Sequence, residues 1–167
     1  MLYYSFIFLI GLIFGSFITM ASYRLGFEAP KSLVGRSKCP KCNHVLGIAA
    51  LVPLFSYLFQ KGKCRYCSAP ISIRYPATEV TTACFFIFTA YMLDGDYINI
   101  LLLNAYVVAM MVLIVTDFEK FIIPDEVQVA VAVIGIFYAF YNDYQLVSVF
   151  VMPLTMLTIS LLLKYGF

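Results

Sequence analysis

The sequence predicts an all-α membrane protein of about five transmembrane helices, with a metal-binding loop between the first and the second. Of its 167 residues, 63% are hydrophobic and only 12% are charged. The mean hydropathy of +0.93 is far above that of an ordinary soluble domain. One polar stretch, residues 23–76, interrupts the apolar runs and holds four of the five cysteines as two Cys-x-x-Cys pairs.

Five apolar stretches are long enough, or nearly so, to cross a bilayer, which takes roughly 20 helical residues. The first, residues 1–22, lacks the basic start of a secretory signal and has too long an apolar run, so we expect a retained membrane helix. The others are expected at 77–93, 97–116, 127–141 and 146–163. The fourth is short, and it either borrows residues 121–123 or packs inside the bundle.

Positive charge is concentrated in one loop. Nine of the eleven Lys and Arg residues lie between Tyr23 and Pro76, and by the positive-inside rule this loop is cytoplasmic. They are Arg24, Lys31, Arg36, Lys38, Lys41, Lys61, Lys63, Arg65 and Arg74. The N-terminus then faces outward, the turns at 94–96 and 142–143 are external, and residues 117–126 return to the cytoplasmic face.

The four loop cysteines predict a structural zinc site. They are Cys39, Cys42, Cys64 and Cys67. Each Cys-x-x-Cys knuckle wraps two sulfurs around an ion, and two knuckles complete a tetrahedral site. A pair of disulfides is the rival interpretation, but a cytoplasmic loop is kept reduced. His44, the only histidine, could replace a sulfur, although four cysteines suffice and we expect a surface side chain.

The residues around the knuckles carry two further expectations. Lys38, Lys41, Lys63 and Arg65 are placed to offset the negative charge of a four-thiolate zinc site. The segment 46–59 is more apolar than a zinc ribbon needs, so we expect it on the membrane surface or against the helices, or as a core for the loop. Cys84, in the second span, is expected to be a small packing residue.

Carboxylates flank the third span. Acids at the end of a membrane helix are costly to desolvate, so they are usually functional or hydrated. Glu119 and Lys120 are expected to be solvated caps. Asp117 follows the unbroken run VVAMMVLIVT, and with a second carboxylate it could share one proton and activate water for peptide hydrolysis. Asp125 precedes the fourth span, as its N-cap or near its positive dipole end.

Four segments of this chain resemble the type IV prepilin peptidase family, the bifunctional leader peptidases and N-methyltransferases. They are GSFITMASYRL at 15–25, RSKCPKCNHVL, LVPLFSYLFQKGKCRYCSAPISIRYPATE, and DFEKFIIPDE. The resemblance covers essentially the whole chain. It implies an intramembrane aspartyl protease of the bacterial cytoplasmic membrane that serves pilus assembly, type II secretion or competence.

The resemblance also implies the reaction and its residues. The family cuts the basic leader of prepilins and pseudopilins after a Gly at the cytoplasmic face, and methylates the new N-terminus with S-adenosylmethionine. Its first catalytic Asp opens an Asp-x5-Ile/Leu-Pro-Asp motif, which maps to Asp117. The four cysteines match its zinc knuckles, in a loop associated with methyl transfer. Glu79 matches a family acid, which either binds the leader's basic residue or the new amino group, or caps its helix.

This chain departs from the family pattern in two places. The sequence contains no Gly-x-Gly-Asp motif, which holds the family's second catalytic Asp, and about three of the family's usual eight spans are missing. We therefore expect a C-terminally truncated chain that is a poor protease alone, unless Asp117 pairs with its copy in a dimer. Thr19 stands where the family usually has Asn, which puts any contact made there, including one for methyl transfer, in doubt.

The sequence thus divides into a first helix at 1–22, a zinc-knuckle loop domain at 23–76, and the N-terminal part of a peptidase domain at 77–167. Expected partners are prepilins or pseudopilins and membrane lipids, without nucleic acid; no oligomeric state is predicted. Two alternative functions remain open: a non-catalytic membrane-anchored zinc module, and a methyltransferase-only remnant.

Overall fold

The computed structural model describes residues 2–25 and 36–142, which are helical outside the metal loop and contain no β-strand. The elements are α1 (Leu2–Leu25), a 3-10 turn η1 (Ile48–Ala50), α2 (Phe55–Phe59), α3 (Arg74–Met92), α4 (Tyr97–Lys120) and α5 (Asp125–Tyr141). In the loop, two isolated β-bridges pair Lys38 with Val45 and Lys63 with Pro70. The helical prediction is confirmed for this part of the chain.

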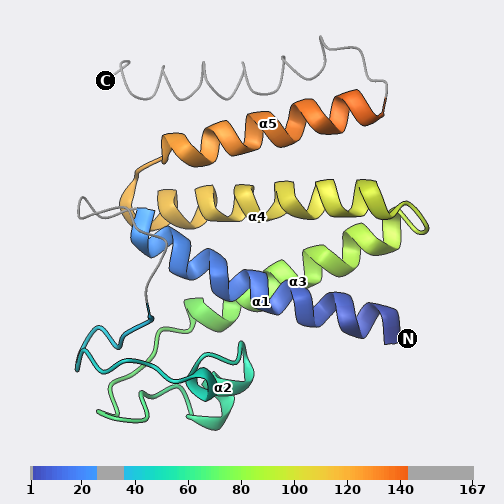
Figure 1. Cartoon of the computed structure of the whole chain (residues 1–167). Coiled ribbons are helices and arrows are strands. Elements are labelled where there is room, and N and C mark those ends of the chain that lie inside the picture. Colours follow the sequence, from blue (N-terminus) through green and yellow to red (C-terminus); the bar gives the residue numbers. More distant parts are fainter. Residues whose placement is uncertain (1, 26–35, 143–167) are drawn as a thin grey trace.

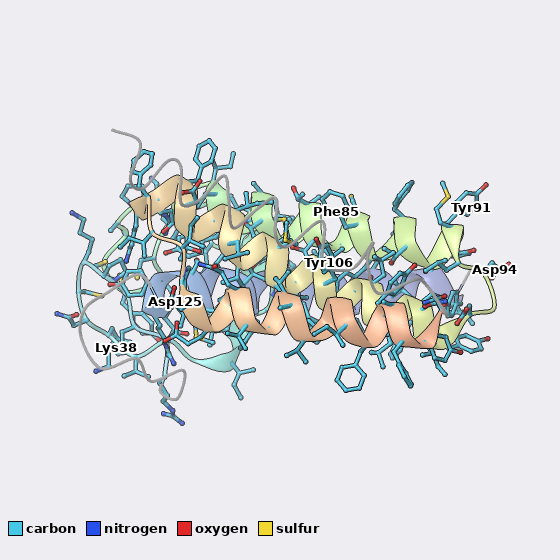
Figure 2. All side chains as sticks on the ribbon, turned by 90° about the horizontal axis from the view of Figure 1, so that it is seen from above. Lys38, Phe85, Tyr91, Asp94, Tyr106 and Asp125 are labelled. Carbon is cyan, nitrogen blue, oxygen red and sulfur yellow. The ribbon has the colours of Figure 1, made fainter. Side chains whose placement is uncertain are left out.

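The four long helices lie side by side, with α4 between α5 and the crossed pair of α1 and α3 (Figure 1). The metal loop lies beyond the end of α1 and the start of α3, and α4 ends and α5 begins at this same end of the bundle (Figure 1). In Figure 2, Lys38 of the loop and Asp125 of α5 lie at one end, and Asp94 lies at the other. This arrangement agrees with the predicted alternation of turns.

Two of these helices are long and apolar enough to cross a bilayer. They are α1 and α4, with mean hydropathies of 2.0 and 2.5. The helices α3 and α5 coincide with the second and fourth predicted spans, and the fifth, at 146–163, lies outside the described residues. The count of five therefore stays a prediction. Large apolar side chains cover the outside of the bundle, including Phe88, Leu101 and Phe140, as expected of helices that face lipid.

The end of α4 lies one turn later than the sequence predicted. The helix continues through Lys120, and Phe121 ends it in the left-handed conformation, with φ of 53°. The Phe121 N–H donates a hydrogen bond of 2.8 Å to the Asp117 carbonyl, which closes the last turn. Asp117 therefore lies within the last turn of α4 and not beyond its end.

The closest packing in the bundle is between α1 and α3. A Cβ added to Gly11 would lie 2.5 Å from the Ala83 Cα, and one added to Gly15 would lie 2.4 Å from the Glu79 Cα. Both distances are too short for a real side chain, so the two glycines allow the helix backbones to touch. The sequence signal is the Gly-x-x-x-Gly spacing inside an apolar helix, which sequence reasoning overlooked.

Buried hydroxyls line the helix contacts and bond to their own helices. Thr19 donates to the Ser16 carbonyl at 2.8 Å, Ser22 to the Thr19 carbonyl at 3.1 Å, and Thr82 to the Thr78 carbonyl at 2.8 Å. Each of these polar groups is thereby satisfied within one helix, without a partner across the interface among the described residues. Small hydroxyl side chains therefore permit the same close approach as the glycines.

Direct side-chain hydrogen bonds join the helices at the end opposite the metal loop. Thr89 on α3 donates to Asn104 on α4 at 2.6 Å, and Asn99 on α4 exchanges hydrogen bonds of 2.9 and 2.8 Å with Asn142, which follows α5. Asp96 caps α4 by accepting from the Asn99 N–H at 3.1 Å. These contacts fix α3, α4 and α5 relative to one another at this end.

The close contact at Gly15 predicts that adding one methyl group there lowers the stability of the bundle. We expect Gly15→Ala to lower the free energy of unfolding by about 1–3 kcal/mol, because the new Cβ overlaps the α3 backbone. Gly135→Ala is the matched control: its Cβ meets no atom within 4 Å, so the better helix propensity should be neutral or stabilising by up to about 1 kcal/mol. Unfolding followed by helical circular dichroism in one detergent compares them. Equal stability of the two variants would contradict the close contact.

Candidate functional site

The first cysteine pair lies in a tight turn closed by backbone hydrogen bonds. The Cys39 N–H donates to the His44 carbonyl at 3.0 Å, and the Asn43 N–H donates to the Cys39 carbonyl at 2.9 Å. Asn43 has a φ of 57°, in the left-handed region that Asn tolerates better than most residues. The turn folds back so that Cys39 and Cys42 face the same point.

The second pair repeats this turn. The Cys64 N–H donates to the Ala69 carbonyl at 2.8 Å, the Ser68 N–H donates to the Cys64 carbonyl at 2.9 Å, and Ser68 has a φ of 56°. A lysine in a β-bridge precedes the first cysteine of each turn. The two knuckles are therefore one structural unit used twice. The shared Lys-Cys-x-x-Cys pattern is the sequence signal for this repeat, and sequence reasoning missed it.

The two knuckles bring all four sulfurs together. The four Sγ atoms lie within 4.8 Å of one another, and the Cys39 and Cys67 sulfurs are 3.9 Å apart. Zn–S bonds of about 2.3 Å in a tetrahedron place the sulfurs about 3.8 Å apart. Cys39 and Cys64 are buried, Cys42 and Cys67 are exposed, and all four are free thiols. The cluster is therefore close enough to hold a metal ion, and its donor set fits zinc.

The knuckle backbone favours a thiolate at Cys39. The backbone N–H groups of Cys42 and Lys41 point at its sulfur and lower its pKa to about 6. The pKa of Cys67 is raised to about 11: the Ala69 N–H favours its thiolate, but loss of hydration beside the cluster and the three neighbouring thiols outweigh that effect. Four thiolates this close repel one another, so the fully ionised cluster requires a cation.

His44 is not part of the cluster. Its side chain is exposed, and its ring lies on the Tyr66 ring with the ring centroids 3.6 Å apart. The metal-competent group contains only the four cysteines. The expected surface position of His44 is confirmed, and its ring contact joins the two knuckles.

Glu79 connects the metal loop to the helix bundle. Its side chain is buried, and its Oε2 accepts a hydrogen bond of 2.6 Å from the Leu54 N–H at the start of α2. Its own helix begins earlier, with Ile73 at the N-cap, so Glu79 does not cap that helix. Leu54 has a φ of 60°, unusual for a branched side chain, which turns its N–H toward the carboxylate. No sequence motif predicted this contact.

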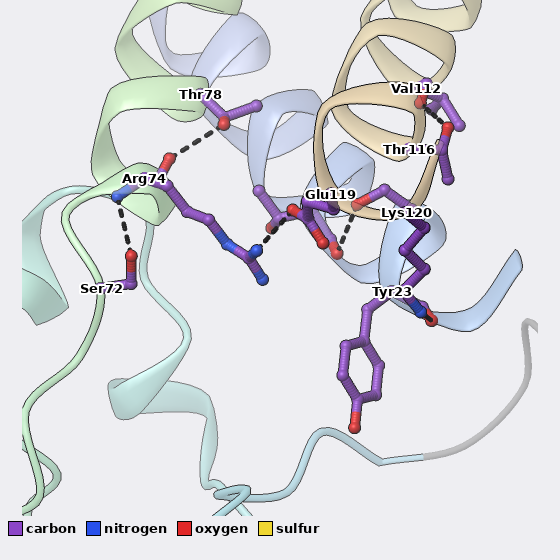
Figure 3. Close-up of polar contacts among 10 residues, drawn as sticks. Tyr23, Ser72, Arg74, Thr78, Val112, Thr116, Glu119 and Lys120 are labelled. Carbon is purple, nitrogen blue, oxygen red and sulfur yellow. Dashed lines mark hydrogen bonds and ion pairs between the residues drawn. The ribbon is translucent and has the colours of Figure 1, made fainter. Parts of the chain in front are cut away.

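Glu119 is paired, and the expectation that it is a solvated cap is wrong. Its carboxylate lies 2.7 Å from an Arg74 guanidinium nitrogen, and the Glu119 side chain is only 15% exposed (Figure 3). The pair joins the start of α3 to the last turn of α4. Lys120 contacts α1, where its Nζ donates to the Tyr23 carbonyl at 3.4 Å (Figure 3).

Asp117 and Asp125 are both exposed at the end of the bundle that carries the metal loop. Asp117 lies in the last turn of α4, which also holds Glu119 of the Arg74–Glu119 pair. Asp125 is the first residue of α5 and Pro124 is its N-cap, so the carboxylate lies near the positive end of the helix dipole. The structure places these acids outside the four-cysteine cluster.

The comparisons with known proteins agree with this architecture. Residues 9–93, which span most of α1, the metal loop and α3, match the family model described as the bacterial peptidase A24 N-terminal domain. The chain belongs to this prepilin peptidase family. The resemblance seen in the sequence is thereby confirmed.

Several relatives of this peptidase family are named "Prepilin leader peptidase/N-methyltransferase". The protein of Bacillus subtilis (strain 168) is 37% identical over 123 residues, or 74% of this chain and 49% of the relative. The protein of Aeromonas hydrophila is 33% identical over 75% of this chain and 51% of the relative. The protein of Myxococcus xanthus (strain DK1622) is 41% identical over 51% of this chain and 25% of the relative. The chain thus spans about half the length of the first two. No solved structure gave a significant match.

Thr19 differs from the family pattern, and Cys84 differs from the sequence prediction. Thr19 is buried, and its hydroxyl bonds to the carbonyl of Ser16 in its own helix. Cys84 is exposed on the outer surface of α3, so the expectation that it is a packing residue is wrong. Its isolation from the knuckles makes it a useful control thiol.

Proposed function

We propose that this chain provides the N-terminal half of a prepilin leader peptidase and N-methyltransferase. The single observation that carries the proposal is the family match over residues 9–93, which contains the cysteine cluster and Glu79. Asp117 lies outside the matched range, in the last turn of α4, at the end of the bundle that carries the metal loop. The substrate would be the basic leader of a prepilin or pseudopilin, cut after Gly. The enzyme would work at the cytoplasmic face of the bacterial membrane, in pilus assembly, type II secretion or competence.

The proposed metal is a structural Zn²⁺ held by Cys39, Cys42, Cys64 and Cys67. Support comes from the sulfur spacing and from the two matching knuckles. When bound, zinc would supply folding free energy to a loop in which η1 and α2 contain no buried residue. Four protein ligands complete the coordination, as in structural rather than catalytic zinc sites.

The proposed catalytic group in this chain is Asp117. Its exposed position at the end of α4 would let its carboxylate reach a peptide bond just outside the helix bundle. In an aspartyl protease, one carboxylate takes a proton from water while a second, protonated carboxyl donates to the scissile carbonyl. The Arg74–Glu119 pair would keep the α4 end against α3 and so hold Asp117 in place.

The remaining parts of the reaction rest on the resemblance alone. The second carboxylate would come from a Gly-x-Gly-Asp segment, which the sequence does not contain. S-adenosylmethionine would supply the methyl group, and we assign no residues to it. Thr19 stands where the family usually has Asn, and it has no side-chain amide that could contact a substrate. Its hydroxyl donates its hydrogen bond within α1.

Asp117→Asn should abolish leader cleavage. A prepilin with Lys-Gly-Phe at its cleavage site is co-expressed with the chain, either alone or with the part of the Bacillus subtilis relative that the chain does not cover. We expect cleavage when that part is supplied, and a loss of about 100-fold or more with Asp117→Asn, because a general acid or base is removed.

The matched control is Asp94→Asn, the same change at the opposite end of the bundle (Figure 2). It should leave cleavage unchanged. Cleavage that proceeds equally well with Asp117→Asn would show that the assignment is wrong. No cleavage in any combination would instead favour a non-catalytic zinc module.

Zinc content should follow the four cysteines. Protein purified with reduced thiols is expected to hold about one zinc per chain, and Cys39→Ser or Cys67→Ser should lower the occupancy and make the loop more sensitive to protease. Cys84→Ser, outside the cluster, should keep both properties. Metal analysis that finds no zinc in the unmodified chain would rule this assignment out.

A further inference from the structure

The segment 48–59, which contains η1 and α2, exposes apolar side chains that nothing in the described chain covers. Ile48 is 88% exposed, Leu58 60% and Phe59 84%, and none of the residues of η1 or α2 is buried. Of the three positions expected from its composition, the segment therefore does not form a core for the metal loop. An exposed apolar patch of this kind indicates a surface that another apolar phase covers.

The Glu79–Leu54 hydrogen bond fixes where this segment lies along the bundle. Glu79 is five residues after Arg74, the first residue of α3, so it is about 7.5 Å further along the helix axis. Leu54, at the centre of the segment, is held at that level. Interfacial helices lie about 5–10 Å into the boundary between lipid headgroups and acyl chains. If the charged start of α3 at Arg74 marks the membrane surface, the segment lies within this depth range, beside the end of the bundle (Figure 1).

Basic side chains border the apolar surface on one side. A cavity of about 650 Å³ opens between the segment and the second knuckle, with Val52, Phe55 and Phe59 among its apolar lining residues. Lys61, Lys63 and Arg65 line the same cavity, and all three are exposed. Apolar side chains beside cations match the acyl chains and phosphates of an anionic lipid surface. A basic peptide leader would be repelled here.

We propose that the segment 48–59 is a membrane-interface anchor that inserts into an anionic lipid surface beside α3. The apolar side chains of η1 and α2 enter the headgroup region, and Lys61, Lys63 and Arg65 contact lipid phosphates. The metal loop is then attached to the membrane at three places, through α1, α3 and this anchor. The inference concerns the position of the loop and holds whether or not the chain cleaves a prepilin.

The chain contains no tryptophan, which allows a background-free test. The full chain carries Phe55→Trp or Phe59→Trp and is placed in lipid nanodiscs made with or without bromine on the acyl chains. Tyr57→Trp is the matched control on the same helix, because the Tyr57 side chain faces Gly62 of the second knuckle. Each variant is measured in zwitterionic lipid and in lipid with added phosphatidylglycerol, and its zinc content is checked.

We expect brominated lipid to remove most of the fluorescence of Phe55→Trp and Phe59→Trp, and much less of that of Tyr57→Trp. Quenching should increase with anionic lipid and fall again in the double variant Lys61→Gln/Lys63→Gln. Zinc-loaded Phe55→Trp and Phe59→Trp proteins that brominated lipid quenches no more than Tyr57→Trp would overturn the anchor. Equal quenching in zwitterionic and anionic lipid would overturn the part assigned to the basic residues.

Discussion

The backbone contact between Gly15 and Glu79 is the constraint on which the rest of this structure depends. Because Gly15 has no side chain, the α3 backbone approaches α1 closely enough for the Glu79 side chain to be buried at the edge of the bundle. From there its carboxylate reaches the Leu54 N–H and holds the metal loop. The Gly15 contact, together with that of Gly11 and Ala83, brings α1 and α3 together, and it also positions the residue to which the loop attaches.

The two ends of the bundle differ in the chemistry that holds them. At the end away from the loop, Asn99, Asn104 and Asn142 join helices through neutral hydrogen bonds. At the loop end the contacts are charged, through the Arg74–Glu119 pair and the Glu79 carboxylate. The end with the charged contacts also carries Asp117 and the cysteine cluster.

Local patterns in the sequence predicted the parts of the site that local chemistry determines. The Cys-x-x-Cys spacing predicted the sulfur cluster, since each knuckle is closed by its own backbone. The end of α4 was placed a turn early, because the polar residues that follow Thr116 look like a loop although the helix continues. The Leu54–Glu79 and Arg74–Glu119 contacts join residues far apart in sequence, so no spacing rule indicated them. The close contact at Gly11 and Gly15 could have been predicted from their Gly-x-x-x-Gly spacing, but sequence reasoning missed it.

The most direct measurement is amide hydrogen exchange at Leu54, in the full chain loaded with zinc. We expect Glu79→Ala to speed this exchange by about tenfold or more, since a hydrogen bond to a carboxylate is lost. Glu79→Gln should stay closer to the unmodified chain, because its amide oxygen can still accept the bond. If Glu79→Ala leaves the Leu54 amide as protected as before, the carboxylate does not hold the loop, and the proposed coupling between bundle and metal loop is contradicted.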